Sequence, residues 1–350
     1  MTSAINFLPV GKYINDCGEE GIRYAWKLDD KGGYYVESGA FLRRTKLGKG
    51  TKDENIRAYT TSVSMGCLLG QGKMPCRFCV TGNTIPFDRL LTSREIALQN
   101  VYMMMDDNDS DLSKNRREFA YMGQGEPGFS YDKVKEVIIG TDLIVKTLRT
   151  ETYRHIFATS GVTTAVEKLT EDLANGDYGN ANILLHLSVH SVNDRDRLMP
   201  INVKYPLKDL IAASVDYAKV AKQKAVINFL MFKNAMFGNF GPFNTASEQE
   251  IRDLAKLLDP RYHRVILCEY NPSPLTGGTS NNVSVEEADA LQKIAESFGL
   301  EVKRFVSFGR KDKLACGLLG GKASPNLAAE EIEEKLNKAL DLVKEYVKEI

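Results

Sequence analysis

The stretch SMGCLLGQGKMPCRFCVTG, residues 64–82, contains three of the chain's six cysteines: Cys67, Cys76 and Cys79. It contains no histidine, so it lacks the fourth ligand that a closed structural zinc site requires. Three thiolates can instead hold a [4Fe–4S] cluster and leave one iron open to a small molecule. The glycines of the stretch let a loop wrap closely round such a compact core. Three ordinary loop or buried cysteines are the alternative, and spacing alone leaves both interpretations open.

Short β-rich runs alternate with amphipathic helical patterns from about residue 58 onward. This alternation predicts an α/β fold with a parallel sheet, either open or curled into a partial barrel. The predicted strands are AYTTSVSM (58–65), REFAYMG (117–123), RHIFATS (154–160), NILLHLSV (182–189), AVINFLMF (225–232), RVILCEY (264–270) and VKRFVSFG (302–309). The predicted helices between them span residues 92–105, 131–145, 206–221, 247–258 and 284–298.

Other patterns flank this alternating part. Residues 21–42 predict a β-hairpin, because IRYAWKL and YYVESGAFL flank the turn DDKGG. Residues 328–350 predict one long amphipathic helix that closes the domain. KLGKGTKDEN (46–55) is the candidate flexible crossing between the hairpin and the main fold. We therefore expect an amino-terminal extension over residues 1–55, a partial barrel over 56–320 and a carboxy-terminal helix over 321–350.

Polar, glycine or cysteine residues follow several predicted strands at the point where each strand ends. They are the cysteine stretch and the segments GQGEP (123–127), ATSG (158–161), SVHS (188–191) and NPSP (271–274). Ligands of parallel α/β sheets gather at the carboxyl ends of the strands. Each segment alone is also typical of a turn, but together they predict a single site.

The composition is typical of a soluble globular protein, with 43% hydrophobic and 26% charged residues. The formal net charge of zero gives no global basic field, which counts weakly against a nucleic-acid partner. Six cysteines in 350 residues are too few for a secreted disulfide scaffold. The first residues lack the pattern of a signal peptide, and no apolar stretch reaches the roughly 18 residues that a membrane span needs. These features predict a cytoplasmic protein with no membrane partner.

Several stretches resemble radical S-adenosylmethionine (SAM) enzymes, and more specifically the RlmN/Cfr family, whose known members methylate adenine in ribosomal or transfer RNA. The matching stretches are YYVESG, the cysteine stretch, YMGQGEP, ATSGV, LSVHSVNDRDRLMPINVKYPL, CEYNPSP and FGRKDKLACGLLGG. The resemblance implies a partial (β/α)6 TIM-like radical SAM barrel with a [4Fe–4S] cluster and SAM as cofactors. It also implies RNA as a substrate and an electron donor such as flavodoxin or ferredoxin.

The resemblance also implies which residues hold these cofactors. Cys67, Cys76 and Cys79 would bind the cluster, whose open iron would chelate the amino and carboxylate groups of SAM. The residues implied to bind SAM are Phe78, Gly125, Glu126, Ser160, Ser188, Val189, His190 and Asn271.

Elementary chemistry fits some of these implied roles. A carboxylate at Glu126 complements the SAM ammonium group, and glycine at Gly125 allows a close approach of the backbone. Without the resemblance, Gly-Glu-Pro is an ordinary strand-to-loop stop. His190 alone is more typical of a hydrogen-bonded core histidine, and Phe78 of a residue that fills the core.

Cys316 matches the family's cysteine that accepts a methyl group from one SAM molecule. In the family, a radical made from a second SAM abstracts hydrogen from this S-methyl group, and the carbon radical adds to an electron-poor aromatic carbon. Sulfur suits this role because it stabilises the neighbouring radical and can later leave. Glu37 matches the family's acid/base glutamate. Without the resemblance, Cys316 is typical of small packing and Glu37 of a solvent-facing strand residue.

Four features depart from the family pattern. Eight residues separate Cys67 from Cys76, where the family has three. Thr60 occupies the position of a further catalytic cysteine, which resolves the enzyme–substrate adduct by forming a disulfide. The family's Ser-Thr-Ser-Gly begins here with Ala158, so one hydrogen bond to the cofactor is lost or moved. The hairpin begins almost at once, so we expect the family's amino-terminal RNA-binding domain to be absent.

Three functions are therefore compatible with the sequence. The leading hypothesis is a radical SAM enzyme that transfers a methyl or one-carbon group through Cys316. The alternative is a radical SAM enzyme of the same fold that abstracts hydrogen from a peptide or small metabolite, as Thr60 and the expected lack of an RNA domain suggest. The third is a non-catalytic protein with a structural metal.

Overall fold

A single ten-stranded sheet forms the centre of the molecule. The computed structural model describes residues 7–14, 21–28, 33–45, 54–106, 116–271, 273–277, 282–305, 319–322 and 324–350. The strand order in the large sheet is β1-β2-β3-β4-β5-β6-β7-β8-β11-β12, and β9 and β10 form a separate two-stranded sheet. The strands are β1 (Phe7–Ile14), β2 (Gly21–Leu28), β3 (Val36–Thr45), β4 (Glu54–Thr61), β5 (Arg116–Tyr121), β6 (Glu151–Thr159), β7 (Ile183–Ser188), β8 (Ala225–Met231), β9 (Ala235–Phe237), β10 (Phe240–Phe243), β11 (His263–Glu269) and β12 (Glu301–Phe305).

The strands from β4 to β12 in the large sheet are all parallel. All seven predicted strands are present in the described residues, although β4 ends at Thr61, earlier than the pattern over 58–65 predicted, and residues 306–309 of the last predicted strand fall outside the described residues. Strand β7 illustrates why they form. Its apolar run ILLHLS is buried at almost every position, as a parallel strand covered by helices requires. The predicted α/β fold with a mostly parallel sheet is confirmed.

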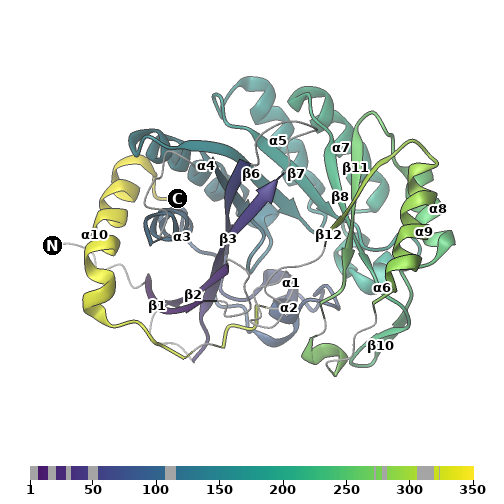
Figure 1. Cartoon of the computed structure of the whole chain (residues 1–350), viewed down its shortest axis with the longest axis horizontal. Coiled ribbons are helices and arrows are strands. Elements are labelled where there is room, and N and C mark those ends of the chain that lie inside the picture. Colours follow the sequence, from purple (N-terminus) through teal and green to yellow (C-terminus); the bar gives the residue numbers. More distant parts are fainter. Residues whose placement is uncertain are drawn as a thin grey trace.

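Helices pack around the outside of this sheet (Figure 1). They are α1 (Leu68–Gln71), α2 (Val80–Thr84), α3 (Ser93–Asp106), α4 (Tyr131–Thr147), α5 (Thr163–Asn175), α6 (Arg195–Leu198), α7 (Leu207–Ala221), α8 (Glu248–Leu257), α9 (Val285–Glu296) and α10 (Ala329–Tyr346), with the short 3-10 helices η1 (Pro127–Ser130), η2 (Pro200–Val203) and η3 (Pro274–Thr276). Helix α3 contacts α4, α5 contacts α7, α8 contacts α9, and α10 contacts both α3 and α4. The predicted carboxy-terminal helix is therefore confirmed as α10.

Four antiparallel strands, β1 to β4, extend the sheet at its amino-terminal edge. The predicted hairpin is confirmed, because β2 pairs with β3. Strand β1 was not predicted. Its Phe7 ring stacks on Trp26 with 5.2 Å between ring centroids, and the Trp26 indole N–H donates to Ser38 Oγ at 2.7 Å. Because β3 also pairs with β4, the hairpin and the parallel strands share one continuous sheet.

One buried carboxylate, Asp106 at the end of α3, joins this extension to the carboxy-terminal helix. It forms ion pairs with Lys12 of β1 at 2.7 Å and Lys335 of α10 at 2.6 Å, and it accepts a hydrogen bond from the Tyr24 hydroxyl at 2.9 Å. Burial opposes the ionisation of Asp106, but the hydrogen bonds from the two lysines outweigh it and hold the pKa of Asp106 below its usual value. The Asp106 carboxylate therefore links β1, α3 and α10, which are far apart in the sequence.

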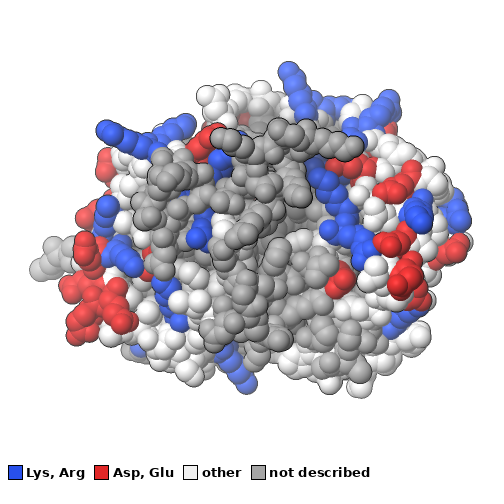
Figure 2. Space-filling view, in the orientation of Figure 1, with Lys and Arg blue, Asp and Glu red and all other residues white. Residues whose placement is uncertain are grey.

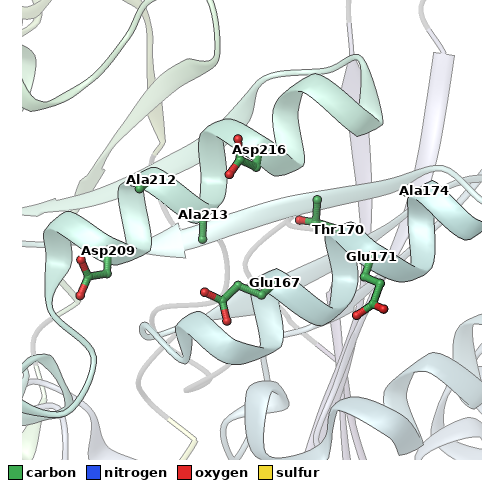
Figure 3. A pocket seen from close by; sticks show the side chains of 8 residues that line it. All are labelled: Glu167, Thr170, Glu171, Ala174, Asp209, Ala212, Ala213 and Asp216. Atoms are coloured by element: carbon green, nitrogen blue, oxygen red, sulfur yellow. The ribbon is translucent and has the colours of Figure 1, made fainter.

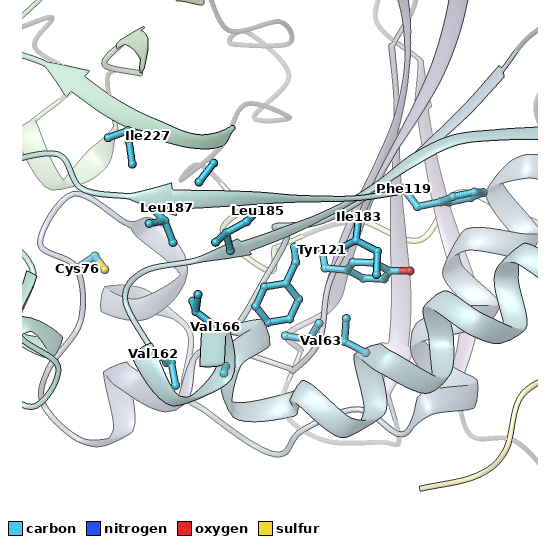
Figure 4. Packing of buried hydrophobic residues seen from close by; sticks show 14 of the residues in the cluster. Val63, Cys76, Phe119, Tyr121, Val162, Val166, Ile183, Leu185, Leu187 and Ile227 are labelled. Carbon is cyan, nitrogen blue, oxygen red and sulfur yellow. The ribbon is translucent and has the colours of Figure 1, made fainter. Parts of the chain in front are cut away.

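The hydrophobic core lies between the sheet and the outer helices. Figure 4 shows aromatic and aliphatic side chains of this core, among them Tyr121 and Leu185 from the sheet and Val166 from α5. Cys76 belongs to the same group of buried residues, so the cysteine stretch is anchored in the core. On the face drawn in Figure 2, acidic and basic side chains are interspersed over much of the described surface. Among the helices that the structure describes, none combines the length and the apolar character of a membrane span.

Two expectations concern residues that the structure does not describe. Cys316, the expected methyl carrier, lies in the segment 306–318, and most of the predicted crossing lies in 46–53. Both segments fall outside the described residues.

Candidate active site

The cysteine stretch forms a loop with two short helices. Cys67 is the residue before α1 and Cys79 is the residue before α2. The side-chain amide of Asn83 donates to the backbone carbonyls of Cys76 at 2.9 Å and Cys79 at 2.7 Å, which fixes the turn between these two cysteines. Gly70 approaches Gly82 so closely that a Cβ on Gly70 would lie 2.3 Å from the Gly82 carbonyl oxygen. The eight residues between Cys67 and Cys76 therefore fold back over the loop, with α1 at their start.

The three thiols of this loop, Cys67, Cys76 and Cys79, are free and largely shielded from solvent. Burial raises the pKa of Cys67 to about 12 and raises the pKa values of Cys76 and Cys79, and repulsion from the Cys79 thiolate raises those of the other two further. The thiols therefore interact with one another. A metal centre bound by these thiols would have to supply the free energy that deprotonates them.

This donor set suits a polynuclear cluster better than a single ion. Within the described part of the chain, no three His, Cys, Asp or Glu side chains approach closely enough to hold one metal ion, which counts against a closed zinc site built from them. A [4Fe–4S] cluster makes a different demand, because each thiolate binds a separate iron at a separate corner. Three free thiols on one loop, two of them buried and one partly buried, supply that donor set, so the residues fit the implied cluster.

Glu126 joins the end of β5 to the end of β6. One carboxylate oxygen accepts a hydrogen bond from the Gly128 N–H at 2.9 Å, and the other accepts from both the backbone N–H at 2.7 Å and the hydroxyl of Ser160. The carboxylate is buried, and burial raises the pKa of Glu126 despite these hydrogen bonds. Gly125 beside it has φ +97°, and a Cβ there would lie 2.2 Å from Ser64 Oγ, so only glycine fits.

The end of β7 packs directly on the cysteine loop. The ring of His190 lies edge-on to the ring of Phe78, with 4.9 Å between the centroids. His190 has φ +58°, and its Nδ1 accepts a hydrogen bond from the Leu230 N–H at 3.1 Å. Burial, followed by repulsion from Arg195, lowers the pKa of His190 to about 3, so the ring is neutral at physiological pH. Val189 beside it is fully buried.

Arg195 connects these strand ends, and the sequence-based expectations did not include it. It begins α6 and is 1% exposed. Its guanidinium donates to the backbone carbonyls of Ser160 at 2.7 Å and Ser188 at 2.8 Å, to the carbonyl of Val189, and to Asn202 Oδ1 at 3.0 Å. The charged run SVNDRDRLMPIN is typical of an exposed turn, so the sequence gives no signal that Arg195 is buried.

Asn271 completes the predicted set at the end of β11 and is also buried. The preceding residue, Tyr270, shares a hydrogen bond with the Ser273 hydroxyl at 2.9 Å, and Ser273 caps η3. The cysteine loop and the ends of β5, β6 and β7 are linked by the contacts of Glu126, Arg195 and Phe78. The structure therefore brings these four segments together, as the strand-end pattern predicted.

Glu37 lies on β3 and is 1% exposed, so it is not the solvent-facing residue that its sequence context alone suggested. One carboxylate oxygen pairs with Arg23, and the other accepts a hydrogen bond from the Gly321 N–H at 2.6 Å. Its backbone carbonyl accepts from the Ser62 hydroxyl, which in turn accepts from the Gln124 N–H at 2.7 Å. Glu37 is thus tied to the GQGEP segment and to the chain just beyond Cys316.

Thr60, which the resemblance aligns with an expected resolving cysteine, lies in β4 opposite Gly39 of β3 and Ala120 of β5. A hydroxyl there cannot form a disulfide. The substitution removes that chemistry without interrupting the strand.

The groove of about 570 Å³ drawn in Figure 3 is a separate feature. It lies between the facing sides of α5 and α7, and its lining carries four carboxylates: Glu167, Glu171, Asp209 and Asp216. None of its lining residues belongs to the strand-end set.

Several known proteins are similar to this chain, although no family model matches it. The chain is 30% identical over 309 residues to the dual-specificity RNA methyltransferase RlmN of a Nitratiruptor species, and the match covers 86% of this chain and 78% of that protein. It is 27% identical over 278 residues to the probable dual-specificity RNA methyltransferase RlmN of Dictyoglomus turgidum, covering 76% and 69%. The structure of a radical SAM methyltransferase from Sphaerobacter thermophilus matches with a TM-score of 0.70 at 22% identity, covering 90% of this chain and 82% of that one, which shows a shared fold.

Proposed function

Because the chain belongs to the family of RlmN radical SAM methyltransferases, we propose that it binds a [4Fe–4S] cluster and SAM and transfers a methyl or one-carbon group through Cys316 to an RNA adenine. The observation that carries this proposal is the loop of three free thiols, of which Cys67 and Cys76 are buried and Cys79 is partly buried, packed through Phe78 against the strand-end segment at His190. The relatives are RNA methyltransferases by name, and this favours methyl transfer over hydrogen abstraction from a peptide or small metabolite.

The cluster would be held by Cys67, Cys76 and Cys79. When bound, it supplies the electron that cleaves SAM into methionine and a 5′-deoxyadenosyl radical. A flavodoxin or ferredoxin is the class of protein that would deliver this electron.

The strand-end residues of the chain would position SAM. Glu126 offers negative charge to the SAM ammonium group. Gly125 permits the close packing against Ser64 that holds the Gly-Glu segment in place. Ser160 and Glu126 hold each other in place through two hydrogen bonds.

The adenosine part of SAM would lie against the remaining residues. Ser188, Val189, His190 and Asn271 would line that side, with Phe78 beside the His190 ring. The neutral ring of His190 can pack on an apolar surface without the desolvation cost of a charge.

Cys316 and Glu37 would carry the methyl-transfer chemistry. Glu37 would serve as the acid/base group, and its pair with Arg23 and its hydrogen bond from Gly321 hold the carboxylate in one orientation. With Thr60 in the place of the resolving cysteine, release of the product cannot proceed through a disulfide at that position.

The test is a mass measurement on the peptide that contains Cys316. After anaerobic reconstitution with iron and sulfide, the protein is incubated with SAM and reductant, and the Cys316 peptide is expected to gain a methyl group while 5′-deoxyadenosine accumulates. Cys316→Ala should abolish the methylated peptide and retain iron. An unmodified peptide in protein that cleaves SAM would reject the carrier role.

A second measurement addresses the RNA substrate. SAM with an isotopically labelled methyl group is expected to transfer the label to adenine in ribosomal or transfer RNA transcripts. Label found only in peptides or small metabolites of a cell extract would overturn the RNA proposal in favour of the alternative.

A further inference from the structure

Arg195 is a buried cation whose hydrogen-bond partners among the described residues are all neutral. They are the backbone carbonyls of Ser160, Ser188 and Val189, the amide oxygen of Asn202, and the sulfur of Met199 at 3.1 Å. With 1% of Arg195 exposed, water cannot compensate the charge. A buried charge normally requires an opposite charge, because moving it out of water costs several kcal/mol.

The acidic residues nearest to Arg195 along the chain form their ion pairs and hydrogen bonds with other residues. The Asp194 carboxylate pairs with Arg197 at 3.0 Å, and the Asp196 carboxylate accepts from the Asn202 amide at 2.5 Å, although the charge of Asp196 still acts on Arg195. No carboxylate in the part of the chain that the structure describes forms an ion pair with Arg195. The described residues therefore stabilise the guanidinium mainly with dipoles, and the charge of Asp196 acts on it without forming an ion pair.

The cysteine loop lies against the helix that begins with Arg195. The Arg77 backbone N–H donates to the Leu198 carbonyl at 2.9 Å, and the Arg77 side chain donates to the Arg197 carbonyl at 3.3 Å. Arg195 also donates to the carbonyl of Val189, and the next residue, His190, packs on Phe78 of the cysteine loop. The loop that would hold the cluster is thus bonded to α6, with Arg195 on the buried side.

We propose that Arg195 is the counter-charge of the iron–sulfur cluster and a positioning residue that holds the ends of β6 and β7 around SAM. This inference rests on the proposed cluster. A cluster held by three thiolates is anionic, and it gains a further negative charge when it accepts an electron. A fixed positive charge nearby therefore stabilises the reduced form more than the oxidised form, because net charge is one of the factors that set the reduction potential.

The two roles of Arg195 can be separated by substitution. Arg195→Lys keeps the charge but loses the planar fork that reaches several carbonyls. Arg195→Met keeps most of the side-chain volume but loses both the positive charge and the hydrogen-bonding fork. Arg197 is the matched control, because it lies on the same helix, is 56% exposed in its side chain, and pairs with Asp194 on the surface.

The measurement is a redox titration of the reconstituted cluster, followed by its electron paramagnetic resonance signal, with a soluble one-electron reductant. At a fixed potential, Arg195→Met is expected to lower the ratio of reduced to oxidised cluster about tenfold, a shift of about 59 mV for a one-electron couple. Arg195→Lys should keep the wild-type potential but weaken SAM binding several-fold. Arg197→Met should change neither quantity.

Three outcomes separate the proposed function from the inference about Arg195. If the wild-type protein binds no iron after anaerobic reconstitution, the proposed function fails. If the wild type has a cluster that cleaves SAM, but Arg195→Met and Arg195→Lys both leave its potential and its SAM affinity unchanged, the inference about Arg195 is wrong. Should Arg195→Met fail to fold, an Arg195→Lys variant with a lowered potential would contradict the counter-charge role.

Discussion

Two buried charges of the molecule differ in what compensates them. Asp106, at the carboxyl end of α3, is neutralised by Lys12 and Lys335 and accepts a further hydrogen bond from Tyr24. Arg195, beside the cysteine loop, is surrounded by carbonyl and amide oxygens and has no ion pair among the described residues. The charge at Asp106 is neutralised within the chain and holds segments together, whereas the charge at Arg195 is the one that we propose the cluster compensates.

The first test of this comparison removes the iron–sulfur cluster, which is the proposed partner of Arg195. Cys76→Ser is expected to reduce bound iron from about four atoms per chain to nearly none and to abolish SAM cleavage, because a hydroxyl is a poor ligand for iron. Iron analysis and the yield of 5′-deoxyadenosine check this. Cys268→Ser, in β11, is the control and should retain both. Full iron loading of Cys76→Ser would contradict the proposed ligand set.

The second prediction concerns Asp106. Asp106→Asn is expected to lower the free energy of unfolding by about 2 kcal/mol at neutral pH, because it leaves two lysines without their buried partner. Urea denaturation followed by circular dichroism measures the change.

The pH dependence of this effect follows from the pKa shift. The folded-state pKa of Asp106 is depressed, so its contribution is complete above the unfolded pKa near 3.9 and is lost as the pH falls through the lower folded value. The difference between the wild type and Asp106→Asn should therefore shrink at acidic pH. A difference that grows on acidification would contradict the assignment.

The third prediction compares the two charges directly. The stability lost on Arg195→Met is expected to be about 1.4 kcal/mol larger in cluster-loaded protein than in iron-free protein, which corresponds to tenfold weaker binding of the cluster. The loss on Asp106→Asn should be the same in both forms. Thermal or urea unfolding of each variant, with and without the cluster, measures this coupling. If the losses at Arg195 and Asp106 depended on iron to the same extent, the two charges would not differ in the way proposed.

The smallest expected effect is at the surface. Asp132 pairs with Lys168 at 2.7 Å, but both side chains are more than half exposed. Asp132→Asn should change the free energy of unfolding by less than about 0.5 kcal/mol, because solvent screens such pairs. A loss of stability as large as that expected for Asp106→Asn would show that burial does not explain the difference between the ion pairs of Asp132 and Asp106.

The parallel strands were predictable from the sequence because their apolar runs and the helical patterns between them are local signals. Strand β1 was missed because its run FLPVGKYI contains Pro9 and Gly11, which argue against a strand, and the pairing with β2 shifts at those residues. The short strands β9 and β10, in AMFGNFGPF, were missed because each is only three or four residues long.

The site was predictable where it depends on strand ends and less so where it depends on distant partners. Glu126 and Ser160 meet because their strands are neighbours in the sheet. The burial of Glu37 depends on Arg23 in the neighbouring strand and on Gly321, which is 284 residues away, and no local pattern encodes that contact. Arg195 lies in a run of charged residues that is typical of an exposed turn, so its burial became visible only in the structure.

The ion pair between Asp106 and Lys335 has a consequence for the growing polypeptide. The two residues are 229 positions apart, so at about 5–20 residues per second a ribosome needs roughly 10 to 45 seconds to reach Lys335 after it has made Asp106. During that interval Lys12 is made but Lys335 is not, and the face of α3 that later contacts α10 still lacks that helix. The contact between α3 and α10 can therefore form only late in the synthesis of the chain.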